Sequence, residues 1–251
     1  MRLAVFSDVH GNLSALEAVL TNIAGEPVDE IVFVGDLCLV GPRPAECLDR
    51  VRDLGCSAVY GNTDDWLFGR QQPPEHLAGL AEWTSAQLDA SQRSWLEGLP
   101  FAYTVSPGER SVDSLLIVHA NPQDVNQLIF PPEDEQMARY GRVRQADSEL
   151  DHLLSGVESS NVVFGHLHIP FIRSRGQTRL INISSLSMPG DGDPRATYAL
   201  FTWEGDRWSF ERKYVSFNMA PEIAAYRANK PPGWQKFIDA INEHGFVPQK
   251  V

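Results

Sequence analysis

The first sixty residues alternate between two kinds of pattern, and this alternation limits the fold more than any other feature of the chain. Three short apolar runs favour β-strands, and the two segments between them repeat apolar residues at helical spacing. The runs cover residues 2–8, 30–36 and 57–62, and the helical segments cover residues 12–25 and 44–55. Strands joined by helices pair in parallel through right-handed crossovers, and the loops at their carboxyl ends commonly form the functional site. The chain start therefore predicts an α/β fold with a site at one edge of a parallel sheet.

The rest of the chain continues as a mixed pattern with more strands. Residues 64–100 have helical spacing, and five later segments have the apolar runs or alternation typical of strands. They cover residues 101–106, 115–120, 161–168, 171–184 and 196–217, and the last two contain hairpin turns. With 251 residues, 43% of them hydrophobic, the chain is long enough to bury a large core.

Two segments stand apart from this pattern. Residues 121–156 are polar and partly helical, and they are too long for an ordinary connection. Long excursions beside a strand end are often lids or binding loops. We therefore expect one domain over residues 1–220 that carries a lid-like insertion at about 121–156. Two short helical patterns predict a C-terminal helical appendage over residues 221–251.

The charge balance excludes one large class of function. A formal net charge of −12 argues against a broad nucleic-acid-binding surface, because such binding depends on neutralising phosphates. It is compatible with a small phosphate ester as substrate, since a bound cation reverses the charge locally. No apolar run reaches the roughly eighteen residues of a membrane span, and no secretion signal is evident at the start. We therefore expect a cytoplasmic protein without a membrane segment.

Polar side chains with metal-binding atoms follow most of the predicted strands. Taken singly, each residue could shape a turn or be a hydrogen-bonded core residue. Together they supply a mixed set of carboxylate, amide and imidazole groups that suits Mn, Fe, Zn, Co or Ni better than Mg or Ca, and the lack of thiolates argues against a structural zinc site. The residues are Asp8, His10, Asp36, Asn62, His119, His166 and His168.

The residues around these positions resemble a known family. The stretches SDVHGN, GDLCLVGP, GNTDD, VHA and GHLH occur in this order across residues 7–168 and are similar to the five motif blocks of the calcineurin-like metallophosphoesterase superfamily. The segment INISSLSMPGDGDPRATYALF, ending at residue 201, is similar to a further block of the small bacterial phosphodiesterase-type branch. The resemblance implies a four-layer α-β-β-α sandwich of two mixed β-sheets flanked by helices.

The resemblance also implies a dinuclear metal centre with a defined ligand set. One divalent cation would be held by Asp8, His10, Asp36 and His168, and the other by Asp36, Asn62, His119 and His166. Asp36 would bridge the two. Such a centre hydrolyses phosphodiesters or phosphomonoesters by in-line attack of a hydroxide that bridges the metals. A non-catalytic metal-binding scaffold or sensor with the same fold is the alternative.

The histidine pair near residue 166 invites a local prediction. His166 and His168 are one residue apart, so on an extended backbone both would point to the same side and could address two neighbouring ions. Leu167 would then point to the other side, into the core.

The sequence departs from the family pattern at several positions. Thr63 stands where many members have a histidine that assists the leaving group, and Asp64 stands where they have an acid, which could orient the site or cap a helix. Ser184 replaces a usual glycine, and Gly190 replaces a usual arginine. The predicted contacts to a substrate, a small phosphate ester such as a nucleotide, are Asn62, Thr63, Asp64, Arg43 and Arg139.

Overall fold

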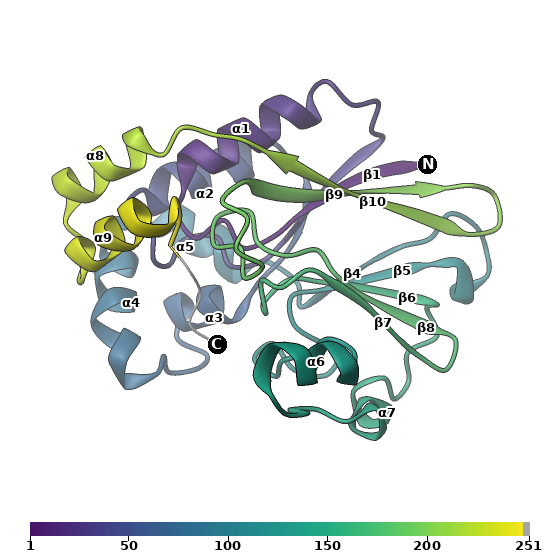
Figure 1. The fold of residues 1–251 in the computed structure, drawn as a ribbon. Coiled ribbons are helices and arrows are strands. Elements are labelled where there is room, and N and C mark those ends of the chain that lie inside the picture. Colours follow the sequence, from purple (N-terminus) through teal and green to yellow (C-terminus); the bar gives the residue numbers. More distant parts are fainter. Residues whose placement is uncertain (248–251) are drawn as a thin grey trace.

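The computed structural model describes residues 1–247. In this part of the chain ten strands form two five-stranded sheets, and nine α-helices surround them (Figure 1). Sheet A has the strand order β10-β9-β1-β2-β3, and sheet B has the order β4-β5-β6-β8-β7.

Sheet A contains the strand–helix alternation that the chain start predicts. Its three parallel strands are joined by two helices, and a long antiparallel hairpin completes the sheet beside β1. The parallel strands are β1 (Arg2–Phe6), β2 (Glu30–Val34) and β3 (Ser57–Val59), and the connecting helices are α1 (Leu13–Ile23) and α2 (Pro44–Asp53). The hairpin consists of β9 (Ala196–Trp203) and β10 (Trp208–Val215).

Sheet B has the same design, with parallel strands in the middle and antiparallel strands at both edges. β5 (Leu115–Val118), β6 (Asn161–Phe164) and β8 (Thr178–Asn182) are parallel, and the edges are β4 (Ala102–Val105) and β7 (Phe171–Arg175). Both sheets are therefore mixed, as the family resemblance implies.

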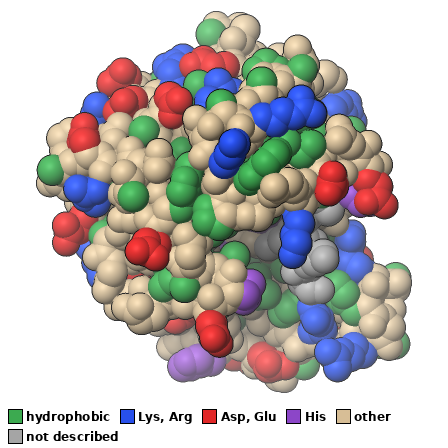
Figure 2. All heavy atoms as spheres, turned by 90° about the vertical axis from the view of Figure 1, so that its left-hand side faces the viewer, with side chains coloured by type: hydrophobic (Ala, Val, Ile, Leu, Met, Phe, Trp, Pro, Cys, Tyr) green, Lys and Arg blue, Asp and Glu red, His purple; other side chains and the backbone are tan. Residues whose placement is uncertain are grey.

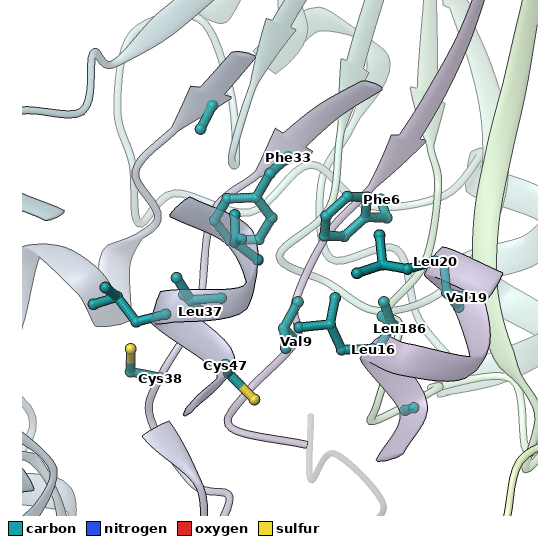
Figure 3. Close-up of a cluster of buried hydrophobic side chains, with 14 of the residues drawn as sticks. Phe6, Val9, Leu16, Val19, Leu20, Phe33, Leu37, Cys38, Cys47 and Leu186 are labelled. Carbon is teal, nitrogen blue, oxygen red and sulfur yellow. The ribbon is translucent and has the colours of Figure 1, made fainter. Parts of the chain in front are cut away.

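The apolar side chains form three layers of core around the two sheets. Val5 and Val32 of sheet A lie in one buried cluster with Ile117 and Ile181 of sheet B, so the sheets pack face to face. The other face of sheet A packs on helices through a cluster that includes Phe6, Leu16, Phe33 and Leu37 (Figure 3). The other face of sheet B packs on the segment that follows β5 through residues such as Phe164 and Leu153. The predicted four-layer α-β-β-α sandwich is confirmed.

The segment over residues 121–156 supplies the helical layer on sheet B. It contains α6 (Glu133–Tyr140) and α7 (Leu150–Leu153), and Ile129, Leu150 and Leu153 are buried against the sheet. Arg173 of β7 reaches into the segment and binds Asp147. This segment therefore belongs to the packed fold.

The helices predicted over residues 64–100 form as α3 (Asn62–Phe68), α4 (Glu75–Gln87) and α5 (Ala90–Glu97). At the other end of the chain, α8 (Ala220–Asn229) and α9 (Trp234–His244) occupy most of the predicted appendage. Its last four residues, 248–251, lie outside the described part of the chain. None of the helices in residues 1–247 combines the length and apolar character that crossing a bilayer requires.

The pair formed by α8 and α9 is attached to the loop that follows β2. Glu222 of α8 is buried and forms an ion pair with Arg43, and it also accepts the backbone N–H of Ser14. The Tyr226 hydroxyl donates to the carbonyl of Val40 at 3.4 Å, and the Asn229 amide donates to the carbonyl of Pro42 at 2.8 Å. These contacts fix the C-terminal helices beside the carboxyl ends of the sheet A strands (Figure 1).

Candidate metal centre

The seven residues predicted as metal ligands lie together where the two sheets expose the carboxyl ends of their parallel strands. Asp8 and Asp36 come two residues after β1 and β2, and His119 and His166 follow β5 and β6. Backbone hydrogen bonds join the loops, because Asp8 N–H donates to Gly35 and Gly165 N–H donates to His119. Parallel pairing within each sheet and face-to-face packing of the sheets thus bring residues more than 150 positions apart into one site.

Most of these ligand candidates occupy an unusual backbone conformation. Five have positive φ, at values of 48° to 63°, namely Asp8, His10, Asp36, His166 and His168. Left-handed backbone is costly for residues other than glycine and clusters at functional sites. The prediction that His166 and His168 share an extended backbone is therefore wrong, since β6 ends before them. Leu167 does lie in the core, buried to 1% exposure.

At two glycines of the motifs, the side chain of a ligand candidate lies directly against the glycine backbone. A Cβ on Gly61 would lie 2.1 Å from Oδ1 of Asp36, and a Cβ on Gly165 would lie 2.2 Å from Oδ2 of Asp8. Both contacts are shorter than any side chain permits, so only glycine fits at either position.

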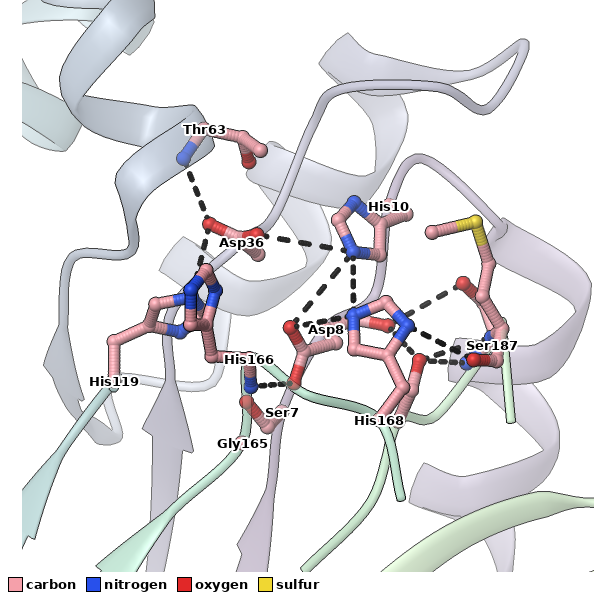
Figure 4. Close-up of polar contacts among 12 residues, drawn as sticks. Ser7, Asp8, His10, Asp36, Thr63, His119, Gly165, His166, His168 and Ser187 are labelled. Carbon is pink, nitrogen blue, oxygen red and sulfur yellow. Dashed lines mark hydrogen bonds and ion pairs between the residues drawn. The ribbon is translucent and has the colours of Figure 1, made fainter. Parts of the chain in front are cut away.

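The first group of ligand atoms comes from Asp8, His10 and His168, whose ligand atoms lie within 4.8 Å of one another. Nε2 of His168 is 3.0 Å from Oδ1 of Asp8 and 3.2 Å from Nε2 of His10 (Figure 4). The other ring nitrogen of each histidine faces a backbone carbonyl, since Nδ1 of His10 is 3.1 Å from Leu39 O and Nδ1 of His168 is 2.9 Å from Met188 O.

These carbonyl contacts decide the tautomers in the first group. A carbonyl oxygen only accepts, so in a neutral ring Nδ1 carries the hydrogen and Nε2 presents a lone pair. Two such lone pairs and the Asp8 carboxylate then face one another without a donor between them. An arrangement of acceptors alone is unfavourable unless a cation lies among them, so these residues fit a metal ion.

The second group comes from Asp36, His119 and His166, whose ligand atoms also lie within 4.8 Å of one another. Nδ1 of His119 is 2.8 Å from Val34 O, which leaves Nε2 to face Oδ1 of Asn62 at 3.0 Å and Oδ1 of Asp36 at 3.5 Å. His166 is held the other way round, because its Nε2 is 2.8 Å from the carbonyl of Asn126, so Nδ1 is the ring nitrogen on the side of the ligand group.

The two groups are joined through both carboxylates. Oδ2 of Asp36 is 3.8 Å from Nε2 of His10, so Asp36 lies within reach of the first group as well as the second. Oδ2 of Asp8 accepts the backbone N–H of His166 at 3.1 Å. The seven residues therefore form one continuous polar centre, with Asp36 between its halves (Figure 4).

The electrostatics of the centre favour cation binding. Burial, together with the neighbouring His168, lowers the pKa of His10 to about 3. Burial, together with His119, likewise lowers the pKa of His166 to about 3. Both imidazoles are therefore neutral at pH 7. Burial and the negative charge of Asp8 raise the pKa of Asp36 to about 7. The carboxylates of Asp8 and Asp36 thus lie close together without enough positive charge nearby to stabilise both in the ionised form.

Asp64 positions the backbone around Asp36. Its carboxylate is buried and accepts three backbone N–H groups, from Asp36 at 2.8 Å, Leu37 at 2.9 Å and Gly61 at 2.9 Å. It therefore orients the ligand loop, one of the two roles predicted for it. The N-cap of α3 is Gly61, and Asp64 accepts the N–H of that residue from the third helical position. Thr63 contributes its backbone N–H to Oδ1 of Asp36 at 2.9 Å.

The segment after β8 positions the first group. The Ser185 hydroxyl donates to the carbonyl of Asp8 at 3.0 Å and accepts the N–H of Met188 at 2.9 Å. Ser184 has φ of 72°, the left-handed conformation that suits the glycine usual at this place in the family branch, and its hydroxyl donates to the carbonyl of His168. The serine thus keeps the glycine-like backbone and adds a hydrogen bond.

A cleft of about 860 Å³ opens over the centre. His10, Asp36, Asn62, His166 and His168 line it, and so does Thr63. Figure 2 shows this side of the molecule, which is hollowed in its lower half, with histidine and basic side chains near the rim.

Three predicted substrate contacts do not line this cleft. Asp64 is turned toward the backbone of the ligand loop, and Arg43 pairs with Glu222. Arg139 donates to the carbonyl of Gly190, the position where the family branch has an arginine. Residues 121–156 also contribute nothing to the described lining, although Asn126 contacts His166. Their action as a lid stays a prediction.

The outer wall of the cleft consists of residues that the sequence did not predict as part of the site. This wall comes from α4 and α9 and includes His76, Leu77, Lys236, Phe237 and Ala240. Lys236, Ala240 and His244 recur at four-residue spacing, which places them on one face of α9. Nothing in the sequence shows what that face of the helix contacts.

Comparisons with known proteins agree with this geometry. The model of the calcineurin-like phosphoesterase superfamily domain matches residues 1–206. The phosphodiesterase YfcE of Escherichia coli K12 is 25% identical over 211 residues, which cover 80% of this chain and 86% of that protein. An uncharacterized protein of Methanocaldococcus jannaschii is 27% identical over 252 residues, covering 92% of this chain and 94% of that protein.

A solved structure extends the comparison to the whole fold. The crystal structure of a metallophosphoesterase from Sphaerobacter thermophilus is 29% identical, has a TM-score of 0.72, and covers 93% of this chain and 95% of that one. The resemblance inferred from the motif blocks is thereby confirmed. With two buried Asp and His groups placed where its motifs converge, the chain belongs to the calcineurin-like phosphoesterase superfamily.

Proposed function

We propose that this protein is a metal-dependent hydrolase of phosphate esters, acting on phosphodiesters in preference to phosphomonoesters. The observation that carries the proposal is the set of acceptor atoms in the centre. Lone pairs of His10 and His168 face each other at 3.2 Å beside the carboxylate of Asp8, and in the second group Nε2 of His119 lies 3.5 Å from Oδ1 of Asp36. Such a site is stable when cations occupy it.

The ligand assignment follows the two groups. Asp8, His10, Asp36 and His168 would hold one divalent cation. Asp36, Asn62, His119 and His166 would hold the other. Mixed oxygen and imidazole ligands favour Mn, Fe, Zn, Co or Ni as the occupants.

When bound, a pair of such cations supplies charge that stabilises phosphoryl oxygens and lowers the pKa of a water molecule. The chain itself supplies orientation. Hydrogen bonds from Nδ1 to backbone carbonyls keep the rings of His10, His119 and His168 aimed at the centre. Thr63 lines the cleft beside Asp36, where its hydroxyl would contact a phosphoryl oxygen and replace part of what the family histidine provides.

A scaffold or sensor is the competing function, because a fold does not fix an activity. Loss of ligand side chains would favour it. In this chain all seven positions of the ligand set carry a side chain that can bind a metal, and five of them line an open cleft. The complete set favours the hydrolase.

The test combines metal analysis with an activity measurement. Protein loaded with Mn²⁺ should bind two equivalents of metal and release p-nitrophenol from bis(p-nitrophenyl) phosphate. Asp36→Ala should bind neither ion firmly and lose activity by about 10³-fold or more, since it removes the shared ligand. Asp206→Ala, which removes an exposed carboxylate in the β9–β10 hairpin, should leave both readouts unchanged. Two bound metals without hydrolysis of diesters or monoesters would identify the scaffold instead.

A further inference from the structure

The cleft over the metal centre has mainly apolar walls. Trp66 of α3, Leu77 of α4 and Phe237 of α9 line it, together with Leu39 and Val40 of the loop after Asp36. Trp66 and Phe237 are half-buried, so part of each ring remains available to a ligand. At about 860 Å³ the cleft matches the size range of sites that enclose a whole small molecule, far more than a phosphate group alone requires.

One face of α9 forms a fixed part of these walls. Lys236, Ala240, Glu243 and His244 lie at helical spacing toward the cleft, whereas Ile238 and Ile241 are buried in a cluster with Tyr226 of α8. The ion pair between the buried Glu222 of α8 and Arg43 of the loop after β2 holds the helix pair in place. A wall anchored in this way can select substrates by shape, because it does not need to be ordered on binding.

The charges along the cleft limit how many phosphates it can accept. Lys236 is the one lysine or arginine among the described residues that line it, and Asp239 and Glu243 from the same helix line it too. Apart from the metal ligands, the described lining thus carries one positive and two negative formal charges. Within this lining, a polyphosphate chain would meet two carboxylates and a single basic side chain, whereas the proposed cations of the centre would bind one phosphate.

From the apolar walls and this charge balance together, we propose that the substrate is a phosphodiester with a single phosphate. The alcohol that stays on the phosphate after hydrolysis carries a large aromatic group and has about the size of a nucleoside. The phosphate lies at the metal centre, and the aromatic group packs on the wall formed by Trp66, Leu77 and α9. The inference rests on the proposed phosphoesterase function and deepens it by naming the substrate class.

A series of esters with one common leaving group tests the apolar wall. The methyl, phenyl and thymidine 5′ esters of p-nitrophenyl phosphate all react by addition of water at phosphorus, with cleavage of the P–O bond to p-nitrophenolate. Differences in kcat/KM therefore report on the other alcohol. We expect the phenyl and thymidine esters to exceed the methyl ester by about 10- to 100-fold, the range of discrimination that apolar pockets achieve. Equal values for the three esters would overturn the inference while leaving the proposed function intact.

A matched pair of variants locates the wall. Ala240→Trp fills the cleft from α9 and should lower the ratio of thymidine to methyl ester kcat/KM at least about fivefold. Gln235→Trp introduces the same side chain on an exposed position of α9 outside the cleft and should leave the ratio unchanged. Circular dichroism and metal content check that both variants fold and load. An unchanged ratio in Ala240→Trp would contradict the assignment of the wall.

A substrate with a polyphosphate chain tests whether the charges of the cleft limit the number of phosphates. Diadenosine tetraphosphate offers the same kind of aromatic group with four phosphates, and we expect its kcat/KM to be at least about tenfold below that of the thymidine ester. The double variant Asp239→Asn/Glu243→Gln should narrow this gap, since it removes the repulsion. Faster turnover of the tetraphosphate by the unaltered protein would overturn the single-phosphate assignment. Failure of every ester in the metal-loaded protein would instead refute the proposed function itself.

Discussion

The two halves of the candidate metal centre contain the same kinds of side chain but depend on different parts of the fold. Each half has one buried aspartate and two histidines whose ligand atoms lie within 4.8 Å. In the first half, His10 and His168 are oriented by the carbonyls of Leu39 and Met188. In the second half, His119 is oriented by Val34 at the end of β2, and His166 by Asn126 of the segment that covers sheet B.

This difference shows how one site can be sensitive to distant elements. The loop that carries Leu39 also carries Val40 and Pro42, which accept hydrogen bonds from α8, so the first half is coupled to the C-terminal helices. The second half is coupled to the layer over residues 121–156. Val40 has φ of 89°, an unfavourable value for a β-branched residue, and the contacts from α8 help to hold it there.

Removing one histidine from each half should have the largest effect and should separate the halves. If the proposed function holds, His168→Ala and His119→Ala should each bind about one metal ion and not two, and lose about 10³-fold in activity, because the proposed reaction uses both ions. Elemental analysis and p-nitrophenol release measure the two quantities. His152→Ala, an exposed histidine on α7, is the control. Loss of both ions from either variant would show that the halves are not separable.

Replacing Asp64 should affect both halves equally, because it holds the backbone at the shared ligand Asp36. Asp64→Ala leaves three buried N–H groups without their acceptor and should lower the free energy of unfolding by about 3 kcal/mol and metal affinity by about 10- to 100-fold. Denaturant unfolding and metal titration provide the readouts. The control is Asp65→Ala, which removes the next carboxylate of α3, one that accepts no N–H from the ligand loops. An effect restricted to one metal ion would contradict the prediction.

Replacing Ser185 should have the smallest effect and should be confined to the first half. Its hydroxyl joins the backbone of Asp8 to that of Met188, whose carbonyl orients His168. We expect Ser185→Ala to weaken one of two metal-binding steps by about tenfold and to leave the other unchanged, as measured by calorimetric titration. Ser174→Ala, on the exposed side of β7, should change neither step. Equal weakening of both steps would show that the halves share their support.

The fold was largely predictable because its signals are local. Apolar runs and helical spacing depend on neighbouring residues, and they correctly placed the strands and helices of sheet A. The side chains proposed as metal ligands were recognisable because each follows a strand within a short motif. The backbone at His166 and His168 was not predictable, since its left-handed geometry is stabilised by packing of Leu167 and by the hydrogen bond to Asp8 rather than by local preference.

The sequence by itself determined which elements form and which side chains can bind a cation, because propensity and ligand chemistry belong to residues and their neighbours. Only the tertiary structure decided which ring nitrogen of each histidine faces the centre, since carbonyls such as Leu39 and Met188 come from other loops. It also decided that α9, more than 200 residues after Asp8, forms a wall of the cleft. Long-range packing sets such contacts, and no local pattern encodes them.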